Sequence, residues 1–311
     1  MILFWSVLYS TGNRPTFAHM AHKSGFVSIV GKPNVGKSTL MNQLLGERLS
    51  IVTPKAQTTR HRIKGILNHD DYQIVFSDTP GILEPHYLLH KKMMEFVDAA
   101  LADADAVLLI NDLSEAYLDE MVIDNLKNVK VPVIVVINKV DLSTENEINK
   151  LIHGWKKAIK PHAVIPVSAL NNFHTEQIVE ALLEVLPDSP PYFNKENLSD
   201  LTQRFFVSEI IREKIFLQFE KEIPYSTEIG IEEFKEEKNL IRIRAIIYVE
   251  RSSQKGIIIG HKGDALKKIG TTARKDMEKF LGKKVFLEMY VKVEEDWRKK
   301  DNVLKKFGYT S

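Results

Sequence analysis

A glycine-rich turn between a short apolar run and an amphipathic stretch constrains the fold of this chain more than any other feature. The turn, GKPNVGKS at residues 31–38, matches the pattern GxxxxGK[ST]. The apolar run 26–30 precedes it, and an amphipathic stretch begins at Lys37. Because this turn needs a strand that leads directly into a helix, it places the first part of the chain in the α/β class.

The same alternation continues beyond the turn. Short runs rich in valine and isoleucine are typical of strands that are covered on both faces, and they occur at residues 26–30, 72–76, 106–110, 131–137 and 163–167. Amphipathic stretches lie between them, at residues 37–45, 91–102, 118–125, 145–158 and 175–186. Strands that alternate with helices predict a mainly parallel sheet with right-handed crossovers.

A proline-rich segment, LPDSPPY at residues 186–192, ends this rhythm. It predicts an extended linker, and we place a domain boundary near Ser189, with a first domain at 20–189 and a second at 190–311. The second domain has another order: a helix at 201–219, strands at 227–233 and 240–249, two helices within 253–281, a strand at 285–293 and a basic tail at 296–307. This order predicts an α+β domain.

The composition adds three constraints. The net charge is +2, but residues 251–311 hold 16 lysines and arginines against 8 acidic residues, which suits either a nucleic-acid surface or a solvated face of mixed charge. There is no cysteine, which excludes thiolate chemistry and cysteine-ligated zinc. Residues 1–19 differ from the rest of the chain and do not resemble a secretory signal, so we expect translation to begin at Met20.

The glycine-rich turn and a later segment predict a phosphate site. In the turn, backbone N–H groups would surround a phosphate, Lys37 would bridge phosphate oxygens and the Ser38 hydroxyl would bind Mg²⁺. The segment Asp-Thr-Pro-Gly at 78–81 follows an apolar run, so Asp78 would hold the magnesium hydration shell and the N–H of Gly81 would face a γ-phosphate.

Two further segments predict that the base is guanine. Asn-Lys-Val-Asp at 138–141 follows an apolar run, and a carboxylate at Asp141 accepts two hydrogen bonds from N1–H and the exocyclic amine of guanine. Lys139 would cover the base with its stem, and Ser168-Ala169 would offer a backbone N–H to the guanine oxygen. The four segments together predict a GTP-binding switch.

The polar stretch QTTRH at 57–61 lies between the turn and Asp78. One of its threonines would complete the magnesium shell when GTP is bound; Thr59 is our choice and Thr58 the alternative. A plain surface loop is the other interpretation of this stretch.

Together these segments resemble the translation-factor-related P-loop GTPases, and more narrowly the Era family. The matching segments are GKPNVGKSTLMNQLLG, KAQTTRHRIKGI, DTPGI, NKVD, SAL and IIIGHKGDALKKIG, and the resemblance runs over 23–307. It implies a GTPase domain followed by a type II KH domain, binding to the 3′ region of 16S rRNA, a role in maturation of the small (30S) ribosomal subunit, and peripheral association with the inner membrane in some bacteria.

The resemblance also implies the site residues. GTP binding is expected from Gly31, Lys32, Pro33, Asn34, Val35, Gly36, Lys37, Ser38, Thr39, Asp78, Thr79, Pro80, Gly81, Asn138, Lys139, Val140, Asp141, Ser168 and Ala169. Catalysis is expected from Lys37, Thr59 and Gly81, and metal binding from Ser38, Thr59 and Asp78. Ile82 stands where many small GTPases carry a water-orienting glutamine, so we expect slow unaided hydrolysis, with help from K⁺ bound near Asn34.

The segment Gly260-His261-Lys262-Gly263 joins two helical stretches and predicts a KH loop that clamps single-stranded RNA. A glycine-containing connection between two helices is the structural alternative. Basic residues at Lys267, Lys268, Arg274 and Lys275 would add electrostatic attraction.

The basic tail leaves its partner open. With Trp297 it would contact rRNA or anionic lipid, or it would form a solvated helix. We expect a cytoplasmic monomer. Two other functions have to be weighed: a phosphotransferase, which would not need Asn-Lys-Val-Asp, and a constitutive RNA-binding protein with a vestigial nucleotide site, against which the intact Lys37, Ser38 and Asp78 argue.

Overall fold

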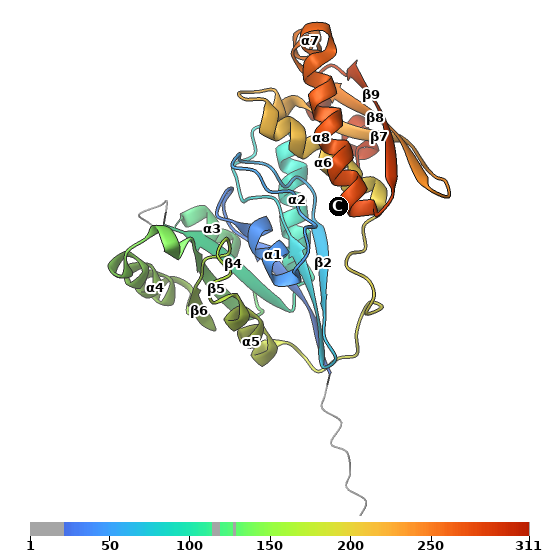
Figure 1. Ribbon diagram of the computed structural model, residues 1–311. Helices are drawn as coiled ribbons and strands as arrows, with labels where there is room; N and C mark the ends of the chain where they lie inside the picture. The colour runs from blue at the N-terminus through green and yellow to red at the C-terminus, as the bar shows by residue number, and fades with distance from the viewer. Residues whose placement is uncertain (1–21, 114–118, 127–128, 311) are drawn as a thin grey trace, which may run out of the picture.

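The computed structural model describes residues 22–113, 119–126 and 129–310 (Figure 1). The predicted non-structural segment 1–19 and start at Met20 therefore lie outside the described residues, as does Leu118 at the start of one predicted helix. The chain builds a large six-stranded sheet and then a smaller three-stranded one (Figure 1).

The large sheet is mainly parallel, as predicted. Its strands are β1 (Lys23–Val30), β2 (Ile63–Asn68), β3 (Tyr72–Asp78), β4 (Ala106–Asp112), β5 (Val133–Asn138) and β6 (Ala163–Pro166), in the order β2-β3-β1-β4-β5-β6. All neighbours run parallel except β2, which is antiparallel to β3. The carboxyl ends of the five parallel strands therefore meet at one edge, where ligands bind in sheets of this kind.

Strand β2 is absent from our sequence-based assignment. It is short, lies at the sheet edge and contains Gly65, so it lacks the continuous apolar run of the central strands. A Cβ atom at Gly65 would lie 2.4 Å from Leu45 Cδ1, so the glycine lets helix α1 approach the sheet closely.

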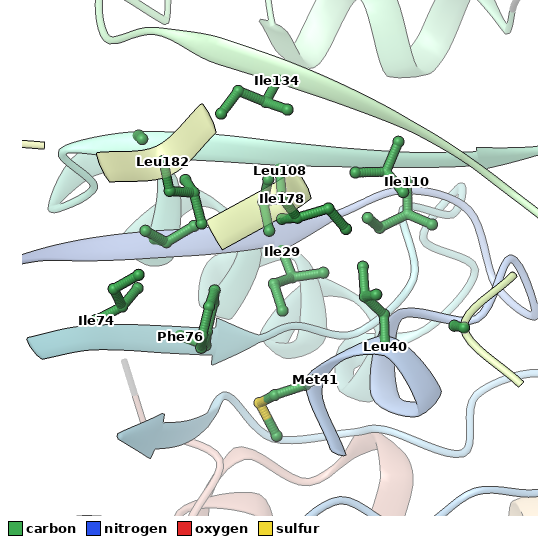
Figure 2. Packing of buried hydrophobic residues seen from close by; sticks show 14 of the residues in the cluster. Ile29, Leu40, Met41, Ile74, Phe76, Leu108, Ile110, Ile134, Ile178 and Leu182 are labelled. Atoms are coloured by element: carbon green, nitrogen blue, oxygen red, sulfur yellow. The ribbon is translucent and has the colours of Figure 1, made fainter. Parts of the chain in front are cut away.

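Helices cover both faces of this sheet, because successive strand residues point to opposite sides. Helices α1 (Lys37–Leu45) and α5 (Thr175–Val185) lie on one face, where Ile29, Phe76 and Leu108 pack against Leu40 and Ile178 (Figure 2). Helices α2 (Leu88–Ala102), α3 (Glu120–Leu126) and α4 (Glu145–Ile159) cover the other.

The proline-rich linker is extended and follows the edge of the large sheet (Figure 1). Leu198 accepts a hydrogen bond from Ile66 N–H at 2.9 Å, and Gln73 Oε1 accepts from the N–H groups of Tyr192 and Phe193 at 2.8 and 2.9 Å. Residues on both sides of the predicted boundary near Ser189 therefore pack on the first domain.

The second domain has three helices on one side of a small sheet (Figure 1). Its order is α6 (Gln203–Gln218), β7 (Glu228–Glu236), β8 (Leu240–Val249), α7 (Ser252–Ile259), α8 (Asp264–Leu281), β9 (Lys284–Val293) and α9 (Asp301–Lys306). Strand β8 is central, antiparallel to β7 and parallel to β9. The predicted α+β architecture is confirmed.

The tail packs between the domains rather than standing free in solvent. Trp297 is fully buried, its Nε1 donates to the Ser226 carbonyl at 2.9 Å, and it joins a cluster with Met93 and Phe96 of α2. The expectation that Trp297 meets lipid or RNA, or lies on a solvated helix, is therefore wrong. Within the described residues, no helix is long and apolar enough to cross a membrane.

Candidate functional site

The four predicted segments meet at the carboxyl edge of the large sheet. They line one cleft of about 460 Å³, to which they contribute Pro33, Asn34, Gly36, Lys37, Ser38, Thr39, Gly81, Asn138, Lys139, Asp141 and Ser168. The loop after α1 supplies further lining from Ile51 to Thr59. Other predicted residues lie beside or behind the lining: Gly31, Lys32, Val35, Asp78, Thr79, Pro80, Val140 and Ala169.

The phosphate loop needs glycine at two positions. Gly31 and Gly36 have φ angles of 147° and 102°, which side chains rarely allow. A Cβ atom would lie 2.2 Å from the Ile110 carbonyl oxygen at the first position and 2.2 Å from Asn138 Nδ2 at the second. The loop therefore turns its backbone inward while packing against the ends of β4 and β5.

Lys37 is held inside this loop. Its Nζ donates to the carbonyls of Gly31 and Lys32 at 3.0 and 2.7 Å. Burial lowers the pKa of Lys37 to about 8, against the opposing attraction of Asp78. A phosphate placed in the loop would favour the charged ammonium and exchange these carbonyl contacts for contacts with its own oxygens.

Three oxygen-bearing side chains converge beside Lys37. Ser38 Oγ donates to Asp78 Oδ2 at 2.6 Å and lies 2.8 Å from Thr59 Oγ1. The other Asp78 oxygen, Oδ1, is buried and has no hydrogen-bond partner in the structure. Burial raises the pKa of Asp78, although the Ser38 hydroxyl and Lys37 oppose this. Hydroxyls around one carboxylate with an unused oxygen fit a hard cation such as Mg²⁺.

The two candidate threonines point in different directions. Thr58 Oγ1 donates to the Lys55 carbonyl at 2.6 Å and lies 2.6 Å from Thr53 Oγ1, within its own loop. The hydroxyl that reaches the Ser38–Asp78 pair belongs to Thr59. This geometry favours Thr59 as the metal-side residue.

The segment after Asp78 lies against the phosphate loop. A Cβ atom at Gly81 would lie 2.6 Å from the backbone nitrogen of Pro33, and Ile82 N–H donates to the Gly31 carbonyl at 3.0 Å. The Ile82 side chain is 2% exposed and packs in the core. Thr79 Oγ1 donates to the Ile29 carbonyl at 2.8 Å, which gives Thr79 a structural role.

Asn138 ties the base-side segments together. Its Nδ2 donates to the Val35 carbonyl at 2.8 Å, and its Oδ1 accepts from Ala169 N–H at 2.9 Å. Lys139 Nζ donates to the Asn34 carbonyl at 2.8 Å, which holds it beside the cleft, while the Asp141 side chain is exposed. The guanine oxygen would accept a hydrogen bond either from the Ala169 N–H, which also donates to Asn138, or from the N–H of Leu170.

Sequence reasoning missed two leucines at the rim of the cleft. Leu142 and Leu170 line it but remain 77% and 79% exposed. Each directly follows a predicted segment, so a leucine immediately after Asp141 and after Ala169 is the signal that would have identified them. Both offer apolar surface to a base.

Sequence reasoning also missed the contacts that join the Thr59 loop to the second domain. The Arg60 guanidinium donates from Nη1 to the Thr227 carbonyl at 2.7 Å and from Nη2 to the Pro224 carbonyl at 3.0 Å. Arg212 Nη1 of α6 donates to the Thr58 carbonyl at 2.6 Å, and Lys55 Nζ donates to the Phe219 carbonyl at 2.7 Å. Because these partners lie more than 150 positions away, no local pattern in the sequence predicts them.

Charged groups at this junction balance one another. Arg60 pairs with Glu228 at 3.2 Å, and Tyr309 Oη donates to the same carboxylate at 2.5 Å. Burial acts to raise the pKa of Glu228, but the arginines Arg60 and Arg212 hold it below its ordinary value. His61 stacks on Tyr309 with ring centroids 4.3 Å apart, and burial lowers its pKa. The interface therefore favours ionised Glu228 and neutral His61.

The predicted KH loop lies between α7 and α8. A Cβ atom at Gly260 would lie 2.6 Å from Ala265 Cβ, whereas one at Gly263 would meet no atom within 4 Å. His261, Lys262, Lys267, Lys268, Arg274 and Lys275 are all exposed. Gly260 thus serves close packing, and Gly263 leaves open space next to a basic helix surface.

Comparison with known proteins agrees with both halves of this description. The family model described as 50S ribosome-binding GTPase matches residues 26–139, and the KH domain model matches residues 222–298. The structure also resembles a crystal structure of Era in complex with MgGDPNP and nucleotides 1506–1542 of 16S ribosomal RNA. The TM-score is 0.89, with 39% identity over 93% of this chain and 100% of that one.

A second crystal structure, of a tyrosine-to-alanine variant of Aquifex aeolicus Era bound to GDP·AlF4⁻, gives a TM-score of 0.89. It is 40% identical over 93% of this chain and 100% of that one. Identity at this level over both domains, with every guanine-nucleotide segment in place, establishes descent as well as fold: the chain belongs to the Era family of GTPases.

Proposed function

We propose that this protein is a GTP-hydrolysing switch that binds the 3′ region of 16S rRNA and assists maturation of the 30S subunit. The Era structure with MgGDPNP and a 16S rRNA fragment supports the proposal. The observation that carries it lies in this chain: the loop that brings Thr59 to Ser38 in the cleft is bonded through Arg60 to the KH domain.

The cleft residues have distinct parts in this proposal. Lys37 and the backbone N–H groups of the phosphate loop bind and orient the phosphates, and Gly81 presents its N–H to the γ-phosphate. Ser38, Thr59 and Asp78 would hold Mg²⁺, which supplies neutralisation of phosphate charge. Hydrolysis then depends on positioning and charge rather than on a covalent intermediate.

Loss of the γ-phosphate acts on the Thr59 loop. Without that phosphate and its metal contact, the loop has fewer partners in the cleft, while Lys55 and Arg60 remain bonded to the KH domain. The loop therefore has contacts in both domains. A change of its position with the bound nucleotide would change its contacts with the KH domain.

The KH loop is the proposed RNA clamp. Gly263 leaves room for a sugar–phosphate backbone, and exposed His261, Lys262, Lys267 and Lys268 supply donors and positive charge. Conversion of Gly263 to aspartate adds a carboxylate to open space and so tests this role directly.

The hydrolytic step needs help that Ile82 does not give. We propose that a bound K⁺ ion assists hydrolysis. Its ligand would be Asn34, which lies at the exposed edge of the phosphate loop. The purified chain is expected to turn over GTP faster in K⁺ than in Na⁺ at equal ionic strength, and Asn34→Ala should remove the difference. Equal rates in both salts would refute the K⁺ site but leave the switch intact.

We place the protein in the cytoplasm as a monomer, with peripheral association at the inner membrane. The exposed lysines Lys299, Lys300 and Lys305 would face anionic lipid, although each pairs with a nearby acidic residue, and buried Trp297 supplies no apolar anchor. Binding would then be electrostatic alone, so co-sedimentation with anionic vesicles should disappear at high salt. Light scattering measures the molar mass in solution and so tests whether the protein is a monomer.

A direct test of the switch is GTP hydrolysis by the full-length chain with and without Lys37→Met. The variant keeps an unbranched side chain but loses the ammonium, so turnover should fall by about 100-fold or more. Retained turnover would contradict the assignment of the cleft.

A further inference from the structure

The small sheet of the KH domain has α6, α7 and α8 on one side; on the other, Phe307 after α9 covers the end at Tyr248, which is 6% exposed, with ring centroids 4.9 Å apart. This second side, the open sheet face, carries four cross-strand rows. In the register of β8 with β9 these rows are Arg242–Phe286, Arg244–Glu288, Ile246–Tyr290 and Tyr248–Lys292. The alternate residues of β9, such as Val285 and Val291, pack in the core beneath the helices.

Two aromatic residues on this face are about half exposed to solvent. Phe286 is 45% exposed and Tyr290 is 53% exposed. They are four residues apart on one face of β9, so they lie about 13 Å from each other. Exposed aromatic rings on an open sheet are the feature on which bases of single-stranded RNA stack, one base to a ring.

One cation lies over Phe286, and two others lie near the ring of Tyr248, which is buried. Arg242 lies over Phe286 at 5.3 Å from the ring centroid, and the ammonium groups of Lys292 and Lys306 lie 6.0 and 5.9 Å from the centroid of Tyr248. By the strand register the face carries the cations Lys235, Arg242, Arg244, Lys284 and Lys292 and the acidic residues Glu228, Glu233 and Glu288.

The acidic groups are already engaged. Glu233 and Glu288 both pair with Arg244, at 3.7 and 3.4 Å, and Glu237 pairs with Arg242 at 3.1 Å. Lys292 and Lys306 extend toward a ring instead. At the Tyr248 end of the face, Lys292 and Lys306 therefore offer positive charge to a polyanion, beside Glu232 and Glu294, which also act on Tyr248.

Strand β9 also connects this face with the KH loop side. It is an edge strand, and its inward residue Met289 packs against the helix that follows the loop: a Cβ atom at Gly270 of α8 would lie 2.8 Å from Met289 Cε. A strand of RNA that leaves the helix side needs only to pass the edge of β9 to reach Phe286 and Tyr290.

We propose that the open sheet face is a second contact for single-stranded RNA. Bases stack on Phe286 and Tyr290, and phosphates lie near Lys235, Lys292 and Lys306. This inference extends the proposed function, since it adds nucleotides to those that the KH loop clamps, which number about four.

The test uses the full-length chain with a GTP analogue and two fluorescent RNAs from within the 1506–1542 region. One has about 20 nucleotides, and the other is a segment of about six nucleotides that fills little more than the KH groove. Stacking contributes about 1–3 kcal/mol per base, so the double variant Phe286→Ala, Tyr290→Ala should bind the longer RNA at least tenfold more weakly and the shorter one nearly as well as the wild type.

Two controls separate stacking from damage to the fold. Tyr192→Ala removes an aromatic residue of similar exposure (49%) from the linker and should change neither affinity. The double variant Phe286→Trp, Tyr290→Trp keeps the rings and should retain wild-type affinity for the longer RNA. Unchanged binding of the longer RNA by the alanine variant would overturn the proposal and leave the face available for a protein.

The outcome is independent of the KH loop. Gly263→Asp should weaken both RNAs, whereas loss of the open sheet face should weaken only the longer one. If Gly263→Asp binds both RNAs normally, the proposed clamp fails, yet selective loss in the alanine variant would still support the open sheet face. Equal losses on both RNAs in the alanine variant would contradict it.

Discussion

Thr59 and Arg60 are adjacent in the chain, yet their side chains enter different domains. The Thr59 hydroxyl lies 2.8 Å from Ser38 Oγ in the nucleotide cleft, and the Arg60 guanidinium donates to the carbonyls of Thr227 and Pro224 in the KH domain. One peptide bond thus separates the proposed metal position from the RNA module. Movement of this loop after GTP hydrolysis would therefore change contacts in both domains.

Arg60→Lys tests this link. Arg60 is 1% exposed, and removing its charge would leave Glu228 buried and unpaired, at a cost of about 3–5 kcal/mol, so lysine is the safer replacement. Lysine keeps the positive charge but lacks the planar guanidinium group with which arginine donates to several acceptors at once. We expect a folded protein whose RNA affinity differs several-fold less between the GTP-analogue and GDP states than that of the wild type.

Arg62→Lys is the matched control for that experiment. Arg62 bonds Ser77 and Asp103 within the first domain, and so it offers the same chemistry without the link. An Arg60→Lys variant with the full nucleotide dependence of the wild type would show that the coupling runs elsewhere.

Thr59→Ala should raise the Mg²⁺ concentration needed for half-maximal GTP hydrolysis by about tenfold or more, because it removes one of three converging oxygens. Thr58→Ala should leave this requirement near that of the wild type, since Thr58 bonds within its own loop. A magnesium titration of both variants decides between the two threonines; the reverse pattern would assign the metal to Thr58.

Asp141→Asn should exchange nucleotide specificity. The variant loses the carboxylate that accepts two hydrogen bonds from guanine, so GTP affinity should fall by about 100-fold or more. The asparagine amide can donate to an oxygen at the same position of xanthine, so XTP should bind better than it does to the wild type. Competition binding with GTP, XTP and ATP measures all three. Unaltered preference for GTP would place the base elsewhere.

Acidification should weaken the junction between the domains. Burial lowers the pKa of His61 below 6.5 in the folded protein. On acidification, His61 is therefore protonated in the unfolded chain at a higher pH than in the folded protein. The stabilisation from neutral His61 is therefore complete above about pH 6.5 and is lost as the pH falls through that value toward its folded pKa. His61→Phe keeps the ring stack on Tyr309 and should flatten the decline in unfolding free energy between about pH 7 and pH 5.

Denaturant titrations across that pH range measure the effect of His61→Phe. The exposed His153 on α4, changed to phenylalanine, serves as a control that should keep the wild-type pH dependence. Parallel curves for His61→Phe and the wild type would assign the acid sensitivity to other groups, among them His90, whose pKa burial lowers to about 4.

The sequence predicts those features whose cause is local. The helix at Lys37–Leu45 and the strand at Leu240–Val249 match their expected limits, because a continuous period or apolar run marks both. The guanine-nucleotide segments are also local, so their residues could be named in advance.

Other features depend on partners far along the chain. Strand β2 is defined by its pairing with β3 at the sheet edge, and burial of Trp297 depends on α2, about 200 positions away. The partners of Arg60 lie 164 to 168 positions beyond it: the Glu228 carboxylate and the backbone carbonyls of Thr227 and Pro224, and no residue type reveals which carbonyls accept. Tertiary contacts of this kind need the folded structure.

The most direct test of the account is RNA binding by the full-length chain to the 16S 1506–1542 fragment, with GTP analogue and with GDP, for the wild type, Gly263→Asp and Gly282→Asp. Both glycines have positive φ, 86° and 66°, and open space at Cβ, so both variants place a side chain at a positive-φ position and only one adds charge at the KH loop. We predict tight binding that GTP analogue favours, lost in Gly263→Asp and kept in Gly282→Asp. Binding that ignores the nucleotide, or that survives Gly263→Asp, would contradict it.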